Sequence, residues 1–292
     1  RIDEFSPDLL GFNLNTFNAR KTYQLIDLVK KKWPRIPILA GGIHMKYCHK
    51  EAVEHQADVV VINEGECIIH DLVDAMLNHG GNKKSLVNSV KDIPGISYLD
   101  TEGVYHIGPQ ESQPVLMDLD QTPFINYDLF NLNDFIKIKN DRIYLGFIVA
   151  QRGCPYPCNF CSESYLIGNV RDNSADYIIG YMDYLNSKYG VTVIGFGDNN
   201  FTLSKKRTDE FCQKVQERNL NKKFSFYCQT NVKTNVTKDQ ATMLKKAGFE
   251  HVSLGIERLT EEGKNLVNKY ISPEKIQESI TNLRGSGINV NS

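Results

Sequence analysis

The chain has 292 residues, of which 41% are hydrophobic and 24% are charged, and its formal net charge is −1. This composition is that of an ordinary globular protein, and the length allows two domains with a substantial core. The near-zero net charge gives no electrostatic reason to expect nucleic acid or an anionic membrane as the main partner. The apolar runs of the sequence are short, so no transmembrane segment is expected.

The cysteine count and the chain ends bear on compartment and completeness. Seven cysteines, an odd number with three clustered, favour a reducing cytoplasm over a disulfide framework. The sequence begins at Arg1 without a basic-then-apolar leader, so a secretion signal is not expected. It starts without Met and stops at Ser292 soon after an apolar run begins, so we expect a fragment cut at both ends.

The first eighty residues alternate between strand and helix patterns. The expected strands are 8–14, 36–40 and 57–62, and the expected helices are 19–33 and 67–77. Buried apolar strands joined by single helices predict a parallel sheet covered on both faces, whose ligands sit beyond the carboxyl ends of the strands. Residues 81–141 are expected to hold a hairpin, 96–99 with 104–107, and then a linker that contains three prolines.

From residue 142 to the end the alternation resumes. The expected strands are 143–150, 192–196, 224–228, 252–256 and 288–290, and the expected helices are 175–188, 205–218, 238–246 and 273–283. Repeated strand–helix units predict a barrel, or part of one, built from parallel strands, and only about four and a half units are present. The expected fold class is therefore α/β, with an incomplete second domain over residues 142–292.

Residues 152–161 contain the most informative motif of the chain. Cys154, Cys158 and Cys161 follow the first strand of the second domain in a C-x3-C-x2-C spacing. Three thiolates this close together can each bind one iron of an iron–sulfur cluster, which leaves one iron open. A zinc site and three unrelated buried thiols are the alternatives. Zinc usually takes four ligands, and neither Cys212 nor Cys228 has a partner nearby in the sequence.

Glycines and polar residues follow the other strands of the second domain. Gly195, Gly197 and Asp198 follow the second strand, residues 229–231 follow the third, and Glu257 follows the fourth. In parallel β/α folds these strand ends share one rim, where active sites collect. The alternatives are a turn or cap role for Asp198 and a helix start for Glu257.

The cysteine loop, with Phe160 just before its last cysteine, resembles the radical S-adenosylmethionine superfamily. The resemblance implies that the three cysteines hold a catalytic 4Fe–4S cluster whose open iron binds S-adenosylmethionine. Reductive cleavage then gives a 5′-deoxyadenosyl radical that abstracts hydrogen. The implied contacts to S-adenosylmethionine are Phe160, Gly195, Gly197, Asp198, Ser253 and Glu257. Asp198 stands where the family carries Glu.

The first eighty residues resemble the last three strand ends of a cobalamin-binding domain, which has a Rossmann-like fold. Segments 12–16, 41–44 and 63–66 carry this resemblance. The implied cobalamin contacts are Asn13, Thr16, Gly41, Gly42, Glu64 and Gly65. A merely tight turn is the alternative for the paired glycines. The Asp-x-His-x-x-Gly segment of such domains would lie before Arg1, so the domain over residues 1–80 is expected to be truncated.

Together the resemblances imply a cobalamin-binding radical S-adenosylmethionine enzyme whose core is a partial TIM barrel. The expected reaction is methyl transfer from cobalamin to an unactivated carbon. The alternatives are a radical cyclisation or oxidation, an enzyme with a vestigial cobalamin domain, and a non-catalytic iron–sulfur electron carrier. Expected partners are a small-molecule or lipid-like substrate and an electron donor such as flavodoxin or ferredoxin.

The remaining cysteines and histidines show no second motif. Cys48, Cys67, Cys212 and Cys228 are expected to pack as small apolar groups. His44 follows the paired glycines and is a candidate for a ligand contact, whereas the other histidines are expected at the surface or in satisfied positions.

Overall fold

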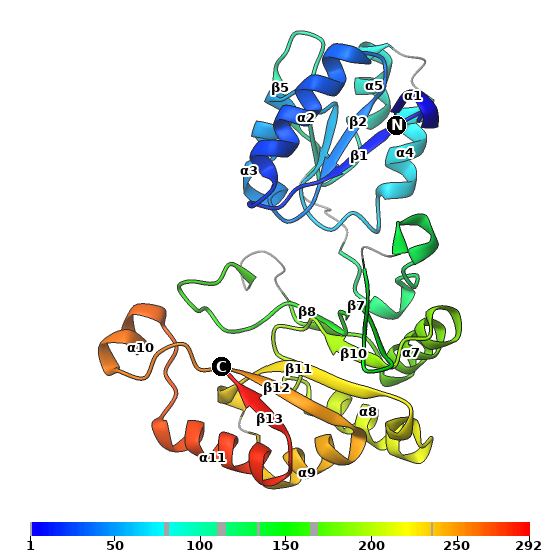
Figure 1. The fold of residues 1–292 in the computed structure, drawn as a ribbon. Coiled ribbons are helices and arrows are strands. Elements are labelled where there is room, and N and C mark those ends of the chain that lie inside the picture. The colour runs from blue at the N-terminus through cyan, green and yellow to red at the C-terminus, as the bar shows by residue number, and fades with distance from the viewer. Residues whose placement is uncertain (1, 79–81, 110–114, 133–134, 164–168, 235) are drawn as a thin grey trace. The chain divides into compact units, whose positions relative to one another are not determined.

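The computed structural model describes residues 2–78, 82–109, 115–132, 135–163, 169–234 and 236–292. The chain forms two compact units, Arg1–Met117 and Asp118–Ser292 (Figure 1). The first unit therefore extends well beyond residue 80, where the sequence pattern placed the end of the first domain.

The sheet of the first unit has five strands in the order of the sequence. They are β1 (Leu10–Asn13), β2 (Ile38–Gly41), β3 (Val59–Val61), β4 (Ile96–Leu99) and β5 (Tyr105–Ile107). The first three strands pair in parallel, and β4 and β5 add to them antiparallel. The hairpin expected at 96–107 thus forms, and it extends this sheet.

Helices cover both faces of this sheet. The helices of the unit are α1 (Ile2–Phe5), α2 (Ala19–Lys32), α3 (Met45–Glu54), α4 (Ile69–Leu77) and α5 (Lys83–Val90). Ile38 and Ala40 pack in one hydrophobic cluster with residues of α2 and α3. Leu39, between them in the strand, packs in a second cluster with residues of α4 and α5. Because side chains alternate along a strand, the two clusters lie on opposite faces.

The sheet of the second unit has six strands in the order β13-β12-β11-β10-β7-β6. They are β6 (Ile136–Lys139), β7 (Arg142–Ile148), β10 (Val193–Phe196), β11 (Ser225–Asn231), β12 (Phe249–Gly255) and β13 (Asn289–Asn291). All neighbours pair in parallel except β6, which pairs antiparallel with β7. A short ribbon joins β8 (Gln151–Arg152) to β9 (Arg171–Asp172). Since β6 and β13 are the two edges, the sheet of the described residues is open.

One face of this second sheet is covered by helices (Figure 1). The helices there are α7 (Ala175–Tyr189), α8 (Lys205–Glu217), α9 (Lys238–Ala247) and α11 (Pro273–Gly285). Inward residues such as Phe196, Phe226 and Phe249 form one hydrophobic cluster with them. The unit also contains α10 (Glu261–Val267) and the short 3-10 helices η1 (Leu119–Gln121), η2 (Tyr127–Leu129), η4 (Leu220–Lys222) and η5 (Val232–Thr234). None of the helices formed by the described residues combines the length and the apolarity needed to cross a membrane.

Side-chain caps fix where these helices begin. The hydroxyls of Ser174, Thr237 and Ser272 each accept a hydrogen bond from a backbone N–H of the first turn, and Pro273 occupies the first turn of α11. Such caps satisfy N–H groups that have no partner within the helix. The helix starts read from the sequence at 175, 238 and 273 are confirmed for this reason.

The opposite face of the second sheet carries side chains that are exposed or half-buried. The strand registers align Phe147, Gly195, Tyr227 and His251 in one row, and Phe147 is 60% exposed. A Cβ atom on Gly195 would lie 2.6 Å from ring atoms of both Phe147 and Tyr227. Gly195 is therefore required by two aromatic rings that meet over the strand.

Candidate functional site

The first unit has a hollow at the carboxyl ends of β1, β2 and β3. Its volume is about 330 Å³, and its lining includes Asn13, Gly41, Gly42, Asn63 and Gly65. The structure thus brings together four of the six residues predicted to contact cobalamin.

Gly42 gives this hollow a wall made of backbone. Its φ is +102°, and a Cβ atom there would lie 2.2 Å from Asn13 Oδ1 and 2.5 Å from the carbonyl oxygen of Leu14. The Leu14 N–H donates to the carbonyl of Gly41 at 2.8 Å, which fixes the two loops against each other. Only glycine fits such a position without strain. The lining of small residues at strand ends suits the close approach of a bulky cofactor.

The other two residues predicted to contact cobalamin lie elsewhere. Thr16 is exposed, and its hydroxyl lies 3.2 Å from Nδ1 of His44. Glu64 is half-buried and does not line the 330 Å³ hollow. The predicted contacts of these two residues remain predictions.

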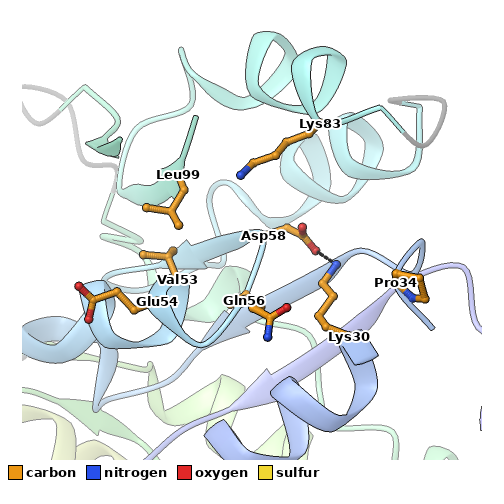
Figure 2. A pocket seen from close by; sticks show the side chains of 9 residues that line it. Lys30, Pro34, Val53, Glu54, Gln56, Asp58, Lys83 and Leu99 are labelled. Atoms are coloured by element: carbon orange, nitrogen blue, oxygen red, sulfur yellow. Dashed lines mark ion pairs between the residues drawn. The ribbon is translucent and has the colours of Figure 1, made fainter. Parts of the chain in front are cut away.

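A second hollow of the first unit, of about 300 Å³, lies at the other end of the strands (Figure 2). Lys30, Asp58 and Lys83 are among its lining residues, and Lys30 Nζ lies 2.5 Å from Asp58 Oδ2. Asp58 directly precedes β3, so this hollow is at the amino ends of the strands. Parallel sheets bind their ligands at the carboxyl ends, which favours the first hollow as the cofactor site.

In the second unit, the cysteine loop follows β8 and is held by residues more than 100 positions away in the sequence. Asn159 donates through its backbone N–H to the carbonyl of Val267 at 3.1 Å and through Nδ2 to that of Leu266 at 3.0 Å. In return, Asn268 Nδ2 donates to the carbonyl of Pro157 at 2.9 Å. The end of α10 therefore fixes the conformation of the segment between the second and third cysteines of the motif.

The number of cysteines in the loop bears on the kind of metal centre. A structural zinc ion usually takes four ligands, whereas each of three cysteines can bind a different iron of a cluster. The loop supplies three cysteines, so an iron–sulfur cluster fits it better than a structural zinc ion.

Two lysines place positive charge near the cysteine loop. Cys158 is buried, and burial raises the pKa of its thiol, while the ammonium groups of Lys269 and Lys233 oppose that rise. Lys269 is only 5% exposed, and its Nζ lies 3.2 Å from Glu257 Oε1. Positive charge near a thiol favours its thiolate form, and it would also offset the net negative charge of a thiolate-bound cluster.

Asp198 is buried among polar partners of the second unit, and its predicted contact with S-adenosylmethionine stays a prediction. It is 2% exposed, and its Oδ1 accepts from the backbone N–H groups of Ala150 at 2.6 Å and Gln151 at 3.1 Å. Its Oδ2 lies 3.3 Å from the Arg207 guanidinium. Burial raises the pKa of Asp198 to about 6, against the opposing effect of Arg207. Both oxygens are thus engaged inside the protein, where they join the end of β7 to the end of β10.

Of the remaining predicted contacts to S-adenosylmethionine, Gly195 is buried beneath the rings of Phe147 and Tyr227, and the other four are exposed or half-buried. Phe160 is 56% exposed, and Gly197 is also exposed. Ser253 is half-buried and donates to Asn291 Oδ1 at 2.6 Å. Glu257 follows β12 with a φ of +65°, an uncommon conformation for a residue with a side chain. Ser253 lies in β12, two residues after His251, and faces the same side of the sheet as the row that contains Gly195. The contacts of these residues with S-adenosylmethionine stay predictions.

Several site residues have no signal in the sequence. Asn268, Lys233 and Lys269 reach the cysteine loop only through tertiary contacts, so neither spacing nor periodicity identifies them. Glu163 lies two residues after the motif, and burial raises its pKa against a hydrogen bond from the Gly153 backbone. In the sequence, its position two residues after Cys161 is the one indication that it belongs to the site.

The other cysteines differ from one another in environment. Cys212 and Cys228 are buried in the core of the second unit, and burial raises the pKa of Cys212 to about 12. Their expected apolar packing is confirmed. Cys48 is half-buried and packs against the hydrophobic cluster of the first unit, so the expectation is confirmed for it as well. Cys67 is exposed, and the expectation is wrong there.

Comparisons with known families decide the assignment. The family described as "B12 binding domain" matches residues 1–73, and the family described as "Radical SAM superfamily" matches residues 148–292. The chain is a radical S-adenosylmethionine superfamily member with a cobalamin-binding domain. The expected α/β fold and the expected cofactor set of iron–sulfur cluster, S-adenosylmethionine and cobalamin are those of the matched families.

Curated relatives extend over nearly the whole chain. An uncharacterized methyltransferase of Pyrococcus horikoshii is 27% identical over 98% of this chain and 60% of its own length. An anaerobic magnesium-protoporphyrin IX monomethyl ester cyclase of Rubrivivax gelatinosus is 26% identical over 99% and 50%. The hopanoid C-3 methylase of Methylococcus capsulatus is 23% identical over 99% and 53%. The chain thus spans little more than half the length of these relatives.

Solved structures share the fold. The methyltransferase TsrM from Kitasatospora setae, with cobalamin and a [4Fe-4S] cluster bound, aligns with a TM-score of 0.76 at 18% identity, covering 97% of this chain and 57% of TsrM. OxsB, a cobalamin-dependent S-adenosylmethionine radical enzyme, aligns with a TM-score of 0.76 at 18% identity, covering 99% and 41%. At this identity the likeness establishes the fold.

Proposed function

We propose that this chain is the cofactor-binding part of an enzyme that transfers a methyl group from cobalamin to an unactivated carbon. The observation that carries the proposal is the presence of two strand-end sites of complementary chemistry in one chain. One is the hollow walled by Gly41 and Gly42, and the other is the loop of three cysteines.

In this proposal the second unit holds the radical-generating cofactors. Cys154, Cys158 and Cys161 bind three irons, and the asparagine amides that tie the loop to α10 keep the sulfurs in position. Lys233 and Lys269 offset the negative charge of the thiolates. When bound, the cluster and S-adenosylmethionine supply an adenosyl radical, and cobalamin supplies the methyl group.

The accessible residues around the sheet would bind S-adenosylmethionine. Phe160 would lie near the adenine, while Gly195 and Gly197 present backbone beside the methionine part. Ser253 and Glu257 would contact the ribose. Asp198 acts indirectly, because it fixes the ends of the strands that carry the cysteine loop and the two glycines.

The first unit would bind cobalamin with the lining of its 330 Å³ hollow. Asn13, Gly41, Gly42 and Gly65 are the contacts that the geometry supports, and Thr16 and Glu64 are contacts proposed from the resemblance alone. Gly41, Gly42 and Gly65 would let the cofactor approach the backbone closely on this part of the lining.

Substrate, electron donor and compartment are further parts of the proposal. A small-molecule or lipid-like substrate suits the row of exposed Phe147 and half-buried Tyr227 and His251, which offers aromatic and polar groups. Flavodoxin or ferredoxin would supply the electron. A reducing cytoplasm would keep the cluster cysteines as thiols before iron binds.

Anaerobic reconstitution with iron, sulfide and cobalamin tests the proposal. S-adenosylmethionine labelled in its methyl group is then added with a reductant, and 5′-deoxyadenosine and labelled cobalamin are measured. We expect both products from the wild-type chain. We expect no 5′-deoxyadenosine from Cys158→Ala, and full formation from Cys67→Ala, which removes an exposed thiol of the other unit.

The alternatives give different results in the same assay. An electron carrier would form no 5′-deoxyadenosine, and an enzyme with a vestigial cobalamin domain would form it without retaining a corrin. A cyclase or oxidase would form it without moving the label to cobalamin. Any of these three results contradicts the methyl-transfer proposal.

A further inference from the structure

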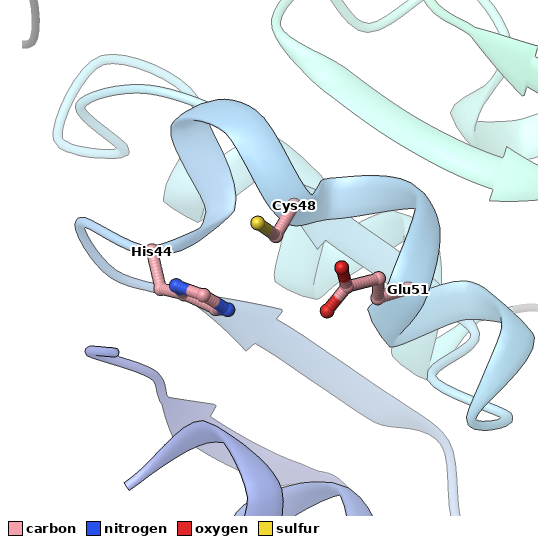
Figure 3. Close-up of side chains that lie close together, drawn as sticks. All are labelled: His44, Cys48 and Glu51. Atoms are coloured by element: carbon pink, nitrogen blue, oxygen red, sulfur yellow. The ribbon is translucent and has the colours of Figure 1, made fainter. Parts of the chain in front are cut away.

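We propose that the first unit binds a divalent transition-metal ion, Zn²⁺ foremost, on His44, Cys48 and Glu51. One nitrogen, sulfur or oxygen ligand atom from each of these side chains lies within 4.8 Å of the others. Within the part of the chain that the structure describes, this is the one group of three metal-binding side chains whose ligand atoms lie this close together. Figure 3 shows the three side chains lying close together, with His44 at the start of α3 and Cys48 and Glu51 farther along the helix.

The local structure explains why the three residues meet. His44 is the N-cap residue of α3, and Cys48 and Glu51 lie four and seven positions after it. Residues at this spacing share one face of a helix. The helix bends at Cys48, whose φ and ψ are −113° and 22°.

Neighbouring side chains orient two of the three ligands. Thr16 Oγ1 lies 3.2 Å from Nδ1 of His44, which leaves Nε2 to face a metal when Nδ1 carries the proton. The hydroxyl of Tyr23 donates to Oε2 of Glu51 at 3.2 Å, which leaves Oε1 for coordination. Outer contacts of this type fix the ligand atoms of metal sites and raise their affinity. A chance gathering of polar side chains would not require them.

The ligand set selects the kind of ion. Zn²⁺ binds thiolate, imidazole and carboxylate groups in tetrahedral geometry, whereas Ca²⁺ and Mg²⁺ prefer oxygen ligands alone. Zinc bonds of about 2.0–2.3 Å place the ligand atoms roughly 3.5–4 Å apart. Because Glu51 is exposed, rotation of its side chain can close the remaining distance.

Water or another small ligand can take the fourth coordination position. His44 and Glu51 line a hollow of about 380 Å³ together with Thr16, Arg20 and Tyr23. The hollow proposed for cobalamin is lined by Gly42 but by none of the three metal ligands. The three metal ligands therefore lie outside that hollow, although Thr16, which contacts His44, is also one of the proposed cobalamin contacts. The metal site does not depend on the proposed reaction.

Cobalt titration of the whole chain tests the site. The cysteines of the loop are first replaced (Cys154→Ala, Cys158→Ala and Cys161→Ala), so that they cannot bind the ion. We expect one equivalent of Co²⁺ per chain, with a thiolate-to-cobalt charge-transfer absorption that Zn²⁺ abolishes by displacement. The absorption should persist in a matched control that also carries Cys67→Ala, and it should disappear with Cys48→Ala.

Two further variants keep the test decisive if Cys48→Ala does not fold. Tyr23→Phe removes only the hydroxyl that orients Glu51, and we expect it to weaken Co²⁺ binding about tenfold or more. His44→Gln should retain the thiolate absorption but lower the affinity and change the ligand-field bands. In the chain with its cysteine loop intact, Cys48→Ala should likewise lower the amount of bound metal by one equivalent per chain.

Three results would overturn the proposal. They are no charge-transfer absorption in the background that lacks the cysteine loop, an absorption that survives Cys48→Ala, and a stoichiometry of one ion per two chains. Cobalamin binding is measured on the same samples. We expect Cys48→Ala to retain cobalamin binding. Loss of cobalamin binding in all variants alike would count against the proposed function, and it would not change the result of the metal titration.

Discussion

The two units position their candidate sites by different means. In the first unit, a sheet covered on both faces ends in a hollow that is lined by glycines at strand ends together with asparagine and apolar side chains. In the second unit, a sheet covered on one face carries a cysteine loop that side-chain amides tie to a distant helix end. The first site is therefore formed by the scaffold before a ligand arrives. The second depends on a few hydrogen bonds and on the cluster itself.

This comparison is tested most strongly at Gly42. We expect Gly42→Ala to destabilise the first unit by about 3 kcal/mol or more, because the new Cβ would collide with Asn13 and with the Leu14 backbone at a φ of +102°. Unfolding is followed by the fluorescence of Trp33, the single tryptophan of the chain, which lies in this unit.

Gly41→Ala is the matched control, since its Cβ would lie 3.8 Å from Val61 in ordinary contact. We expect it to cost less than about 1 kcal/mol. Equal effects of the two substitutions would show that the backbone wall is not rigid, and the contrast between the units would be lost.

A second test concerns Asp198, which joins two strand ends in the second unit. The folded-state pKa of about 6 is above the ordinary value of 3.8, so the carboxyl group favours the folded state most at low pH. This contribution is lost as pH rises through about 6. The difference in unfolding free energy between the wild type and Asp198→Asn should therefore fall by roughly 2 kcal/mol between about pH 4 and about pH 6.5.

Asp176→Asn provides the opposite case for the same measurement. The Lys214 ammonium group lowers the pKa of this exposed carboxyl group, so its contribution appears as pH rises through the acidic range. We expect this difference in unfolding free energy to show a small pH-dependent change of opposite sign. Unfolding is measured by circular dichroism in both variants. A difference for Asp198→Asn that stays constant with pH would mean that burial does not control this carboxyl group.

The smallest expected effect concerns the attachment of the cysteine loop. Asn268→Gly keeps the left-handed backbone at a φ of +52° but removes the hydrogen bond to Pro157. The loss of about 1 kcal/mol should weaken iron retention roughly fivefold, with little change in global stability. Iron release to a chelator is the measurement.

Asn219→Gly is the control for the backbone, because Asn219 has a φ of +54° at the start of η4. It should leave iron retention unchanged. If Asn268→Gly left iron retention unchanged like this control, other contacts would hold the cysteine loop. The loop would then be fixed by the surrounding fold, as the hollow of the first unit is.

Most helices and strands were predictable where the apolar period was strong, as in α2 and α7. The helices that the sequence pattern missed have few buried residues. Helix α3 buries only Met45, Ala52 and Val53, and α10 buries only Lys264. Strand β6 was also missed, since its residues are mostly exposed at a sheet edge and the pattern there resembled a linker.

The sequence by itself determined the cysteine spacing, the paired glycines at a strand end and the alternation that makes both sheets largely parallel. These features are local, because each depends on residues close together in the chain. Only the tertiary structure decided that Asp198 turns inward, that Asn268 reaches Pro157 across 111 positions, and that His44, Cys48 and Glu51 converge. Burial and side-chain direction depend on what packs around a residue, and that is fixed only when distant segments meet.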